Sequence, residues 1–167
     1  LATVFTTVIL RKKILVIHFS SIGDIVLTTP VVRCLKKQLD AEVHFLTKQQ
    51  YLPLVEANPH VTKVFSIQKN VWEVLPALRR ERYDCVVDLH KNLRSFQVRL
   101  GLSFSVKWLT FNKLNLEKWL LTAFKINRLP NVHLVDRYLG ATAPLGVVND
   151  GLGLDFFPAQ SERLSPL

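Results

Sequence analysis

Asp24 is the side chain with the clearest potential for chemistry, because it ends the polar segment "SSIGD" directly after a run of strand-type residues. A carboxylate can act as a general base when it lies about 2.6–3.2 Å from the hydroxyl that it deprotonates. A rigid strand–helix junction would supply the orientation that such proton transfer requires. Asp24 also has a structural explanation, since aspartate is favoured at a helix N-cap or in a first turn. The segment therefore indicates a general base or a helix start.

Other polar residues follow the apolar runs that the sequence predicts as strands. Ligands of open α/β sheets bind outside the carboxyl ends of the strands, so we expect these residues to face one crevice. They are Ser20, Ser21, Gly23, Thr47, Lys48, His90, Lys91, Asn92 and Arg94. The cations favour a ligand with carboxylates or phosphates, and Arg94 could bind a carboxylate bidentately. Solvated charges at a helix start and a packed strand-end histidine are the structural alternatives.

The elements that must position these residues alternate between strand and helix patterns. Lys13–Phe19 is a continuous apolar run, as in a strand that is covered on both faces. Strand patterns recur at 42–47, 63–67, 84–90 and 105–111, with a short strand-like piece at 154–157, and helical or turn patterns at 31–39, 49–59, 71–83, 93–102, 115–126 and 133–146. This alternation predicts an α/β fold, a Rossmann-like parallel sheet with helices on both faces.

Two helix starts compete between Asp24 and Pro30. Asp24 could open a helix that bends at Pro30, or the loop could extend to Thr29, with Pro30 at the first helical position. Both alternatives leave Asp24 at the crevice.

Several site classes are excluded by composition and spacing. Gly23 is the only glycine before residue 101, so the sequence has neither a dinucleotide-binding glycine fingerprint nor a P-loop there. Cys34 and Cys85 form no CxxC pair and lie among apolar neighbours, which predicts buried free thiols. The five histidines show no metal-ligand spacing, so we expect no structural metal. We also expect no cofactor.

The charge favours anionic partners. Lysine and arginine exceed the acidic residues by nine, which favours phosphates, sugar acids or an acidic membrane face. The cations are dispersed rather than aligned on one recognition helix, so we expect no nucleic-acid binding. No apolar run reaches the roughly 20 residues of a membrane-spanning helix.

Four segments strongly resemble family 9 glycosyltransferases, the lipopolysaccharide heptosyltransferases. They are "ILVIHFSSIGDIVLTTPVVRCLKKQ", "AEVHFLTK", "YDCVVDLHKNLRS" and "HLVDRYLGATAPLG", within roughly Lys12 to Phe157. The resemblance implies a GT-B enzyme, whose N-terminal domain holds an inner-core sugar on lipid A and whose C-terminal domain holds ADP-heptose. The family's general base for inverting transfer matches Asp24. If this domain holds the acceptor, we expect the strand-end residues to bind it, together with Arg137, although Arg137 could instead pair with Asp136 or a neighbouring glutamate. The candidates are Ser20, Ser21, Gly23, Lys48, His90, Lys91, Asn92, Arg94 and Arg137.

The family enzymes are about twice as long as this chain. We therefore expect an extension at 1–11, the acceptor-binding domain at 12–158, and a tail or linker at 159–167, without the donor-binding domain. The ADP-sugar would bind only through that missing domain, so we expect this polypeptide alone to transfer no sugar. The resemblance implies a cytoplasmic protein, peripheral at the inner face of the inner membrane. The alternative is a non-enzymatic Rossmann-like module that binds a nucleotide or an anionic ligand.

A second feature concerns the membrane that would carry a lipid acceptor. Between Lys107 and Arg128 four aromatic residues and a leucine are mixed with basic residues. The apolar residues are Trp108, Phe111, Leu114, Trp119 and Phe124, and the basic ones are Lys107, Lys113, Lys118, Lys125 and Arg128. Such an amphipathic element suits the surface of an anionic membrane. A helix packed on the core explains the same pattern.

Overall fold

The sheet has five parallel strands. The computed structural model describes residues 11–111 and 133–157. The strand order is β3-β2-β1-β4-β5, and all four pairs are parallel. The bounds are β1 Lys13–Ile17, β2 Glu42–Lys48, β3 Lys63–Ile67, β4 Cys85–Asp88 and β5 Lys107–Thr110. The predicted Rossmann-like sheet is thereby confirmed.

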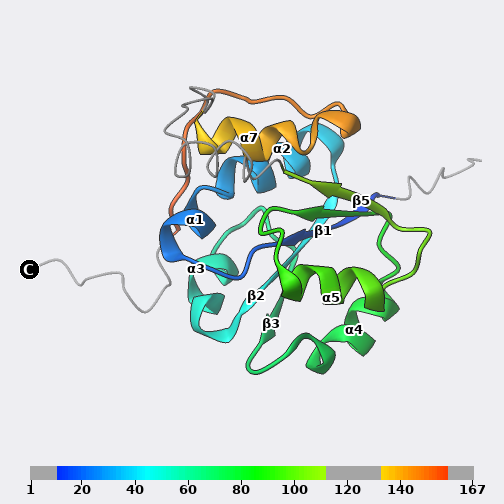
Figure 1. Ribbon diagram of the computed structural model, residues 1–167. Coiled ribbons are helices and arrows are strands. Elements are labelled where there is room, and N and C mark those ends of the chain that lie inside the picture. Colours follow the sequence, from blue (N-terminus) through cyan, green and yellow to red (C-terminus); the bar gives the residue numbers. More distant parts are fainter. Residues whose placement is uncertain (1–10, 112–132, 158–167) are drawn as a thin grey trace, which may run out of the picture.

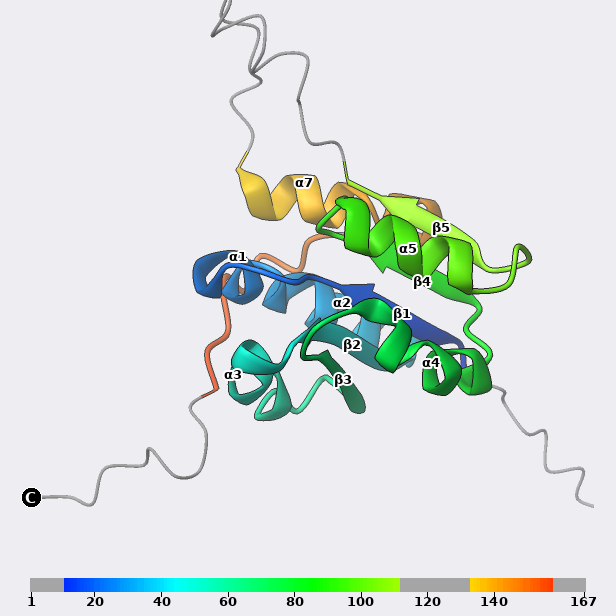
Figure 2. The same cartoon turned by 60° about the horizontal axis from the view of Figure 1, so that its bottom comes forward.

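Helices cover both faces of the sheet (Figures 1 and 2). On one face lie α1 (Ile22–Val26), α2 (Thr29–Leu39), α3 (Leu52–Glu56) and α7 (Leu134–Gly140), and on the other α4 (Leu75–Glu81) and α5 (Leu93–Gly101). Short 3₁₀ turns occupy Gln49–Tyr51, Val71–Glu73 and Ala143–Leu145. Within the described residues, no helix has the length and apolar character needed to cross a bilayer.

Side chains of the central strand β1 contribute to the hydrophobic core on both faces of the sheet. Ile14 and Val16 pack with α2 and α7, whereas Leu15 and Ile17 pack with α4 and α5, and all four are fully buried. Because successive side chains of a strand point to opposite faces, a strand covered on both sides must be apolar throughout. Complete burial of one such side chain stabilises the fold by about 1.5–3 kcal/mol.

The segment after β1 forms two short helices, one beginning near each candidate start. Helix α1 begins at Ile22 with Ser21 as N-cap, and α2 begins at Thr29 with Pro30 in its first turn. The helical conformation is interrupted between them, where the Thr28 hydroxyl donates to the carbonyl of Ile25 at 2.6 Å. Neither predicted alternative was therefore right, because two short helices replace one bent helix or one long loop. Asp24 lies at the third position of α1 rather than at its start.

Residues 154–157 form no strand, which contradicts the strand-like prediction. The backbone N–H of Asp155 donates to the Thr29 hydroxyl at 3.0 Å, so this segment is held by α2 and not by a strand. The expected strand at 105–111 is shorter, and the helical pattern at 133–146 divides into α7 and a 3₁₀ turn. The predicted helix at 115–126, the extension except Arg11, and the tail lie outside the described residues.

Candidate functional site

Asp24 lies beyond the carboxyl end of β1, partly buried, on the helix that leaves this strand. Its Oδ2 accepts hydrogen bonds from the backbone N–H and the hydroxyl of Ser21, at 3.3 and 3.0 Å. These bonds orient the carboxylate, and among the described residues Oδ1 has no hydrogen-bond donor. A carboxylate that is held by one oxygen can accept a proton at the other.

A buried tyrosine–histidine pair lies behind this carboxylate. The Tyr138 hydroxyl and Nε2 of His18 share a hydrogen bond of 3.2 Å, and each residue is only 2% exposed. Burial raises the pKa of Tyr138, and the nearby charge of Asp24 raises it further, while Arg137 opposes the shift. The ring of His90 meets that of His18 edge-on, with 4.7 Å between their centroids. The pair thus packs against His90, and the charges of Asp24 and Arg137 lie near enough to act on Tyr138.

Neither His18 nor Tyr138 was predicted as a site residue. His18 stands inside the first apolar run, where the pattern indicates only a strand, and Tyr138 follows Leu134 by one helical turn, which indicates a core position. Tyr138 does pack in the core, with its ring centroid 4.9 Å from that of Phe111. The guanidinium of Arg137 lies 5.7 Å from the same Phe111 ring centroid. Arg137 therefore lies beside the pair formed by His18 and Tyr138. It is also the neighbour of Asp136 in the sequence.

The turn after β4 positions three more predicted residues. One oxygen of the Asp88 side chain accepts from the backbone N–H groups of His90 and Lys91, at 3.0 and 2.7 Å. Asn92 is the N-cap of α5, and its Oδ1 accepts from the backbone N–H of Ser95 at 3.0 Å. The side chain of Asn92 thus has a capping role of the usual kind.

A hollow of about 410 Å³ lies beside this turn, between the β3–α4 connection and α5. It is lined by Lys69, Asn70, Asn92, Leu93, Arg94 and Gln97. Two cations and three amides suit a phosphate or a carboxylate. Arg94 and Asn92 were predicted as site residues. Lys69 and Asn70 follow β3, and the sequence analysis named no site residue after that strand.

The remaining predicted residues lie at or just after the carboxyl ends of β1 and β2. Lys48 ends β2 and is partly buried, and Ser20 is partly buried between β1 and α1. Gly23 is exposed in α1, and a Cβ added there would meet no atom within 4 Å. Packing therefore does not require a glycine at this position. Thr47 is fully buried, so it does not line the surface of the crevice.

The opposite end of the sheet carries an ion-pair cluster. Glu42, His44 and Glu81 could each offer a ligand atom to a cation. However, the Glu81 carboxylate accepts from Lys63 at 2.5 Å and from Lys13 at 2.9 Å, which lowers the pKa of Glu81 to about 2. Burial lowers the pKa of His44. The ammonium groups thus already neutralise the carboxylates, as a structural network would.

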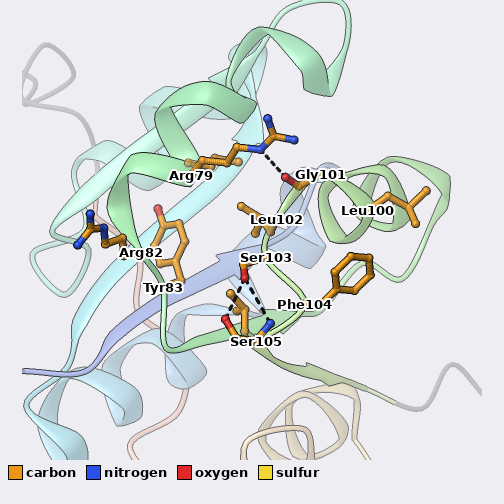
Figure 3. A pocket seen from close by; sticks show the side chains of 11 residues that line it. Arg79, Arg82, Tyr83, Leu100, Gly101, Leu102, Ser103, Phe104 and Ser105 are labelled. Atoms are coloured by element: carbon orange, nitrogen blue, oxygen red, sulfur yellow. Dashed lines mark hydrogen bonds between the residues drawn. The ribbon is translucent and has the colours of Figure 1, made fainter.

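A hollow of about 730 Å³ also lies at the amino ends of β4 and β5, remote from Asp24 (Figure 3). Its lining includes Arg79, Arg82, Tyr83 and the connection from α5 to β5. The Arg79 side chain donates to the carbonyl of Gly101 at 2.6 Å. This hollow was not predicted, because its residues are distributed over two helix ends and a loop.

Both cysteines are buried free thiols, as predicted. Burial raises the pKa of the Cys85 thiol to about 11 and raises that of Cys34 as well. Neither is poised to act as a nucleophile at neutral pH.

Solved glycosyltransferase structures share this fold. A family 9 glycosyl transferase from Veillonella parvula aligns with a TM-score of 0.63 and 20% identity, over 86% of this chain and 45% of that one. The Escherichia coli heptosyltransferase WaaC, solved with ADP, aligns with a TM-score of 0.62 and 17% identity, over 86% of this chain and 50% of that one. The chain therefore has the fold of one Rossmann-like half of a GT-B glycosyltransferase.

Lipopolysaccharide heptosyltransferases are also similar to this chain in sequence. Lipopolysaccharide heptosyltransferase 3 of E. coli K12 is 26% identical over 144 residues, which are 76% of this chain and 40% of that protein. Lipopolysaccharide heptosyltransferase 1 of Campylobacter coli is 26% identical over 141 residues, 78% of this chain and 41% of that protein. No family model matches the chain. The chain is homologous to the family 9 lipopolysaccharide heptosyltransferases over about three quarters of its length, and it spans less than half the length of these relatives.

Proposed function

We propose that residues 12–158 are the acceptor-binding domain of an inverting glycosyltransferase, which transfers a heptose or a related sugar from an ADP-sugar to the lipopolysaccharide inner core. Asp24 is its general base. The observation that carries this proposal is the position of Asp24, oriented by Ser21 beyond the carboxyl end of β1 in a chain homologous to heptosyltransferases.

The chemistry requires one proton transfer and one substitution. Oδ1 of Asp24 accepts the proton of an acceptor hydroxyl, whose oxygen forms a bond to the anomeric carbon of the donor. The bond from that carbon to the diphosphate breaks, and ADP leaves with the electron pair. Attack opposite to the leaving group inverts the configuration. The pair formed by His18 and Tyr138 packs behind Asp24 and fixes the wall of the crevice against which the acceptor lies.

The acceptor is anionic, and the cations of the crevice match it. The reacting hydroxyl is surrounded by Lys48, His90, Lys91 and Arg137. The floor beside Asp24 is formed by Ser20, Ser21 and Gly23. Arg94 and Lys69, with the amide of Asn92, hold a carboxylate or phosphate in the adjoining hollow. Arginine suits this role because its fork binds two oxygens of one carboxylate at once.

The donor binds to a second domain, so the 167-residue chain by itself transfers no sugar. This part of the proposal rests on coverage, because the chain aligns with only 45–50% of the solved transferases. Incubation with labelled ADP-heptose and heptose-deficient lipopolysaccharide tests it. Label on the lipid would overturn the assignment of the donor to another domain.

Calorimetric titration tests acceptor binding directly. We expect a heptose-deficient inner-core oligosaccharide to bind and ADP to bind far more weakly. Replacing Arg94 by glutamine should weaken oligosaccharide binding, whereas the matched control Lys37→Gln, on the exposed side of α2, should not. Tight ADP binding without oligosaccharide binding would instead favour the alternative function, a nucleotide-binding module.

A further inference from the structure

Helix α5 has an apolar outer face. Its inner face buries Ser95, Val98 and Leu102 against the sheet. On its outer face an apolar stripe recurs at helical spacing and continues into the following loop, with exposures of 73, 52, 57 and 98% for Leu93, Phe96, Leu100 and Phe104. An ordinary surface helix has polar residues on the face that points away from the core, so this stripe requires an explanation.

Phe104 projects from the surface. It stands between the hollow of about 730 Å³ and a second hollow of about 260 Å³, and Leu100 and Ser103 border both. Figure 3 shows Leu100 and Phe104 on the side of the first hollow across from Arg82 and Tyr83. Because the phenyl ring of Phe104 is almost fully exposed and borders both hollows, it can insert into an apolar environment without a change in the backbone.

Cations flank the stripe on both sides. Between residues 89 and 111 the sequence has four cations, Lys91, Arg94, Arg99 and Lys107, and no acidic residue. At 100° per residue, Arg94 and Arg99 fall on opposite borders of the stripe. None of the ion pairs between described residues involves these two arginines.

The neighbouring elements reinforce this charge. Helix α4 adds exposed Arg79 and Arg80, and Arg82 follows it. The nearby carboxylate of Glu73 accepts three backbone N–H groups, from residues 68 to 70 at 2.9–3.0 Å, so it is already engaged. The surface as a whole is therefore apolar at its centre and cationic at its border.

We propose that the α5 face, defined as the stripe Leu93, Phe96, Leu100 and Phe104 with Arg94 and Arg99, binds the surface of an anionic phospholipid membrane. The apolar stripe enters the boundary between headgroups and acyl chains, and the arginines extend to lipid phosphates. A second copy of this chain fits the face less well, because a two-fold contact would place the arginines of one copy against those of the other. This membrane binding does not require Asp24, and the apolar stripe has no part in the proposed acceptor binding, although Arg94 belongs to both surfaces.

Co-sedimentation with vesicles tests the proposal. The chain should sediment with vesicles that contain phosphatidylglycerol, and markedly less with vesicles of phosphatidylcholine alone. Added salt should weaken the binding, because it screens the exposed arginines. Equal sedimentation with both vesicles, or with neither, would overturn the proposal.

Variants locate the binding surface. The triple substitution Phe96→Ser, Leu100→Ser and Phe104→Ser should reduce the vesicle partition coefficient more than about tenfold. The double substitution R94Q with R99Q should reduce it by roughly fivefold for each arginine. The matched control is Val148→Ser with Leu152→Ser, both 66% exposed on the segment that packs against α2. Circular dichroism checks that each variant folds.

Two results would contradict the location on α5. In the first, the control and the α5 variants lose binding equally. In the second, light scattering shows a dimer in solution that the α5 variants dissociate, which would assign the face to a second copy. The triple serine variant should bind the oligosaccharide as the wild type does. Loss of vesicle binding with normal oligosaccharide binding therefore separates the membrane proposal from the proposed acceptor function.

Discussion

Replacing Arg33 by methionine should destabilise the fold strongly, although no chemistry has been assigned to this residue. Its side chain is 2% exposed. It donates to both carboxylate oxygens of Asp150 at 2.7 Å, to Asp155, and to the carbonyl of Gly153 at 2.9 Å. These contacts hold the segment after the 3₁₀ turn Ala143–Leu145 against α2.

The magnitude follows from burial. Removing one partner of a fully buried ion pair costs about 3–5 kcal/mol. Here the two carboxylates keep 19% and 24% exposure, so water can partly solvate them after the substitution. We therefore expect a loss of about 2–3 kcal/mol in the free energy of unfolding at pH 7.

The loss should depend on pH. The Arg33 guanidinium holds the pKa of Asp150 well below its usual range in the folded state. The stabilisation is therefore complete above the unfolded value of about 3.9 and disappears as the pH falls toward the folded value. The difference between wild type and variant should thus begin to shrink below about pH 5 and continue to shrink as the pH falls through the folded value.

Urea unfolding followed by tryptophan fluorescence measures this difference. The matched control is Arg11→Met, because Arg11 pairs with Asp40 at 2.8 Å while both side chains are more than half exposed. It should cost less than about 1 kcal/mol. An equal loss for both variants, or a loss for Arg33→Met that stays constant as the pH falls, would refute the reasoning.

Three further outcomes are expected. Gly101→Ala should lower the free energy of unfolding by about 1–3 kcal/mol, because the added Cβ would lie 2.2 Å from the Leu75 side chain of α4. The control Gly140→Ala, whose Cβ would meet no atom within 4 Å, should not lower it. Urea unfolding measures both variants. Tyr138→Phe should cost about 0.5–1.5 kcal/mol, the worth of one hydrogen bond, in the same assay. Cys34 and Cys85 should resist a thiol reagent until the protein unfolds, and rapid modification at neutral pH would contradict their burial.

Much of the fold follows from local patterns. Lys63–Ile67 is the strand that the alternation predicted, and β1 needed only its apolar composition to be recognised. The break between α1 and α2 was missed because Asp24 and Thr29 both carry start signals, and the sequence alone does not show that two helices fit in the space of one.

The polar contacts that the sequence analysis missed, in the core and at the site, join residues that are distant in the sequence. Arg33 looks like a solvated charge on an amphipathic helix, and its carboxylate partners lie 117 and 122 residues away. Tyr138 and His18 are 120 residues apart. Short-range periodicity reports which face of an element is buried, and it does not report which polar groups meet there.

Nuclear magnetic resonance titration tests the central claim, that an acceptor sugar binds beside Asp24. A heptose-deficient inner-core oligosaccharide should shift the backbone resonances of Ser21 and Asp24 and the ring resonances of His90, whereas ADP should leave them unchanged. Shifts with ADP at these residues, or oligosaccharide binding that leaves them unmoved, would contradict the assignment of the crevice to the acceptor.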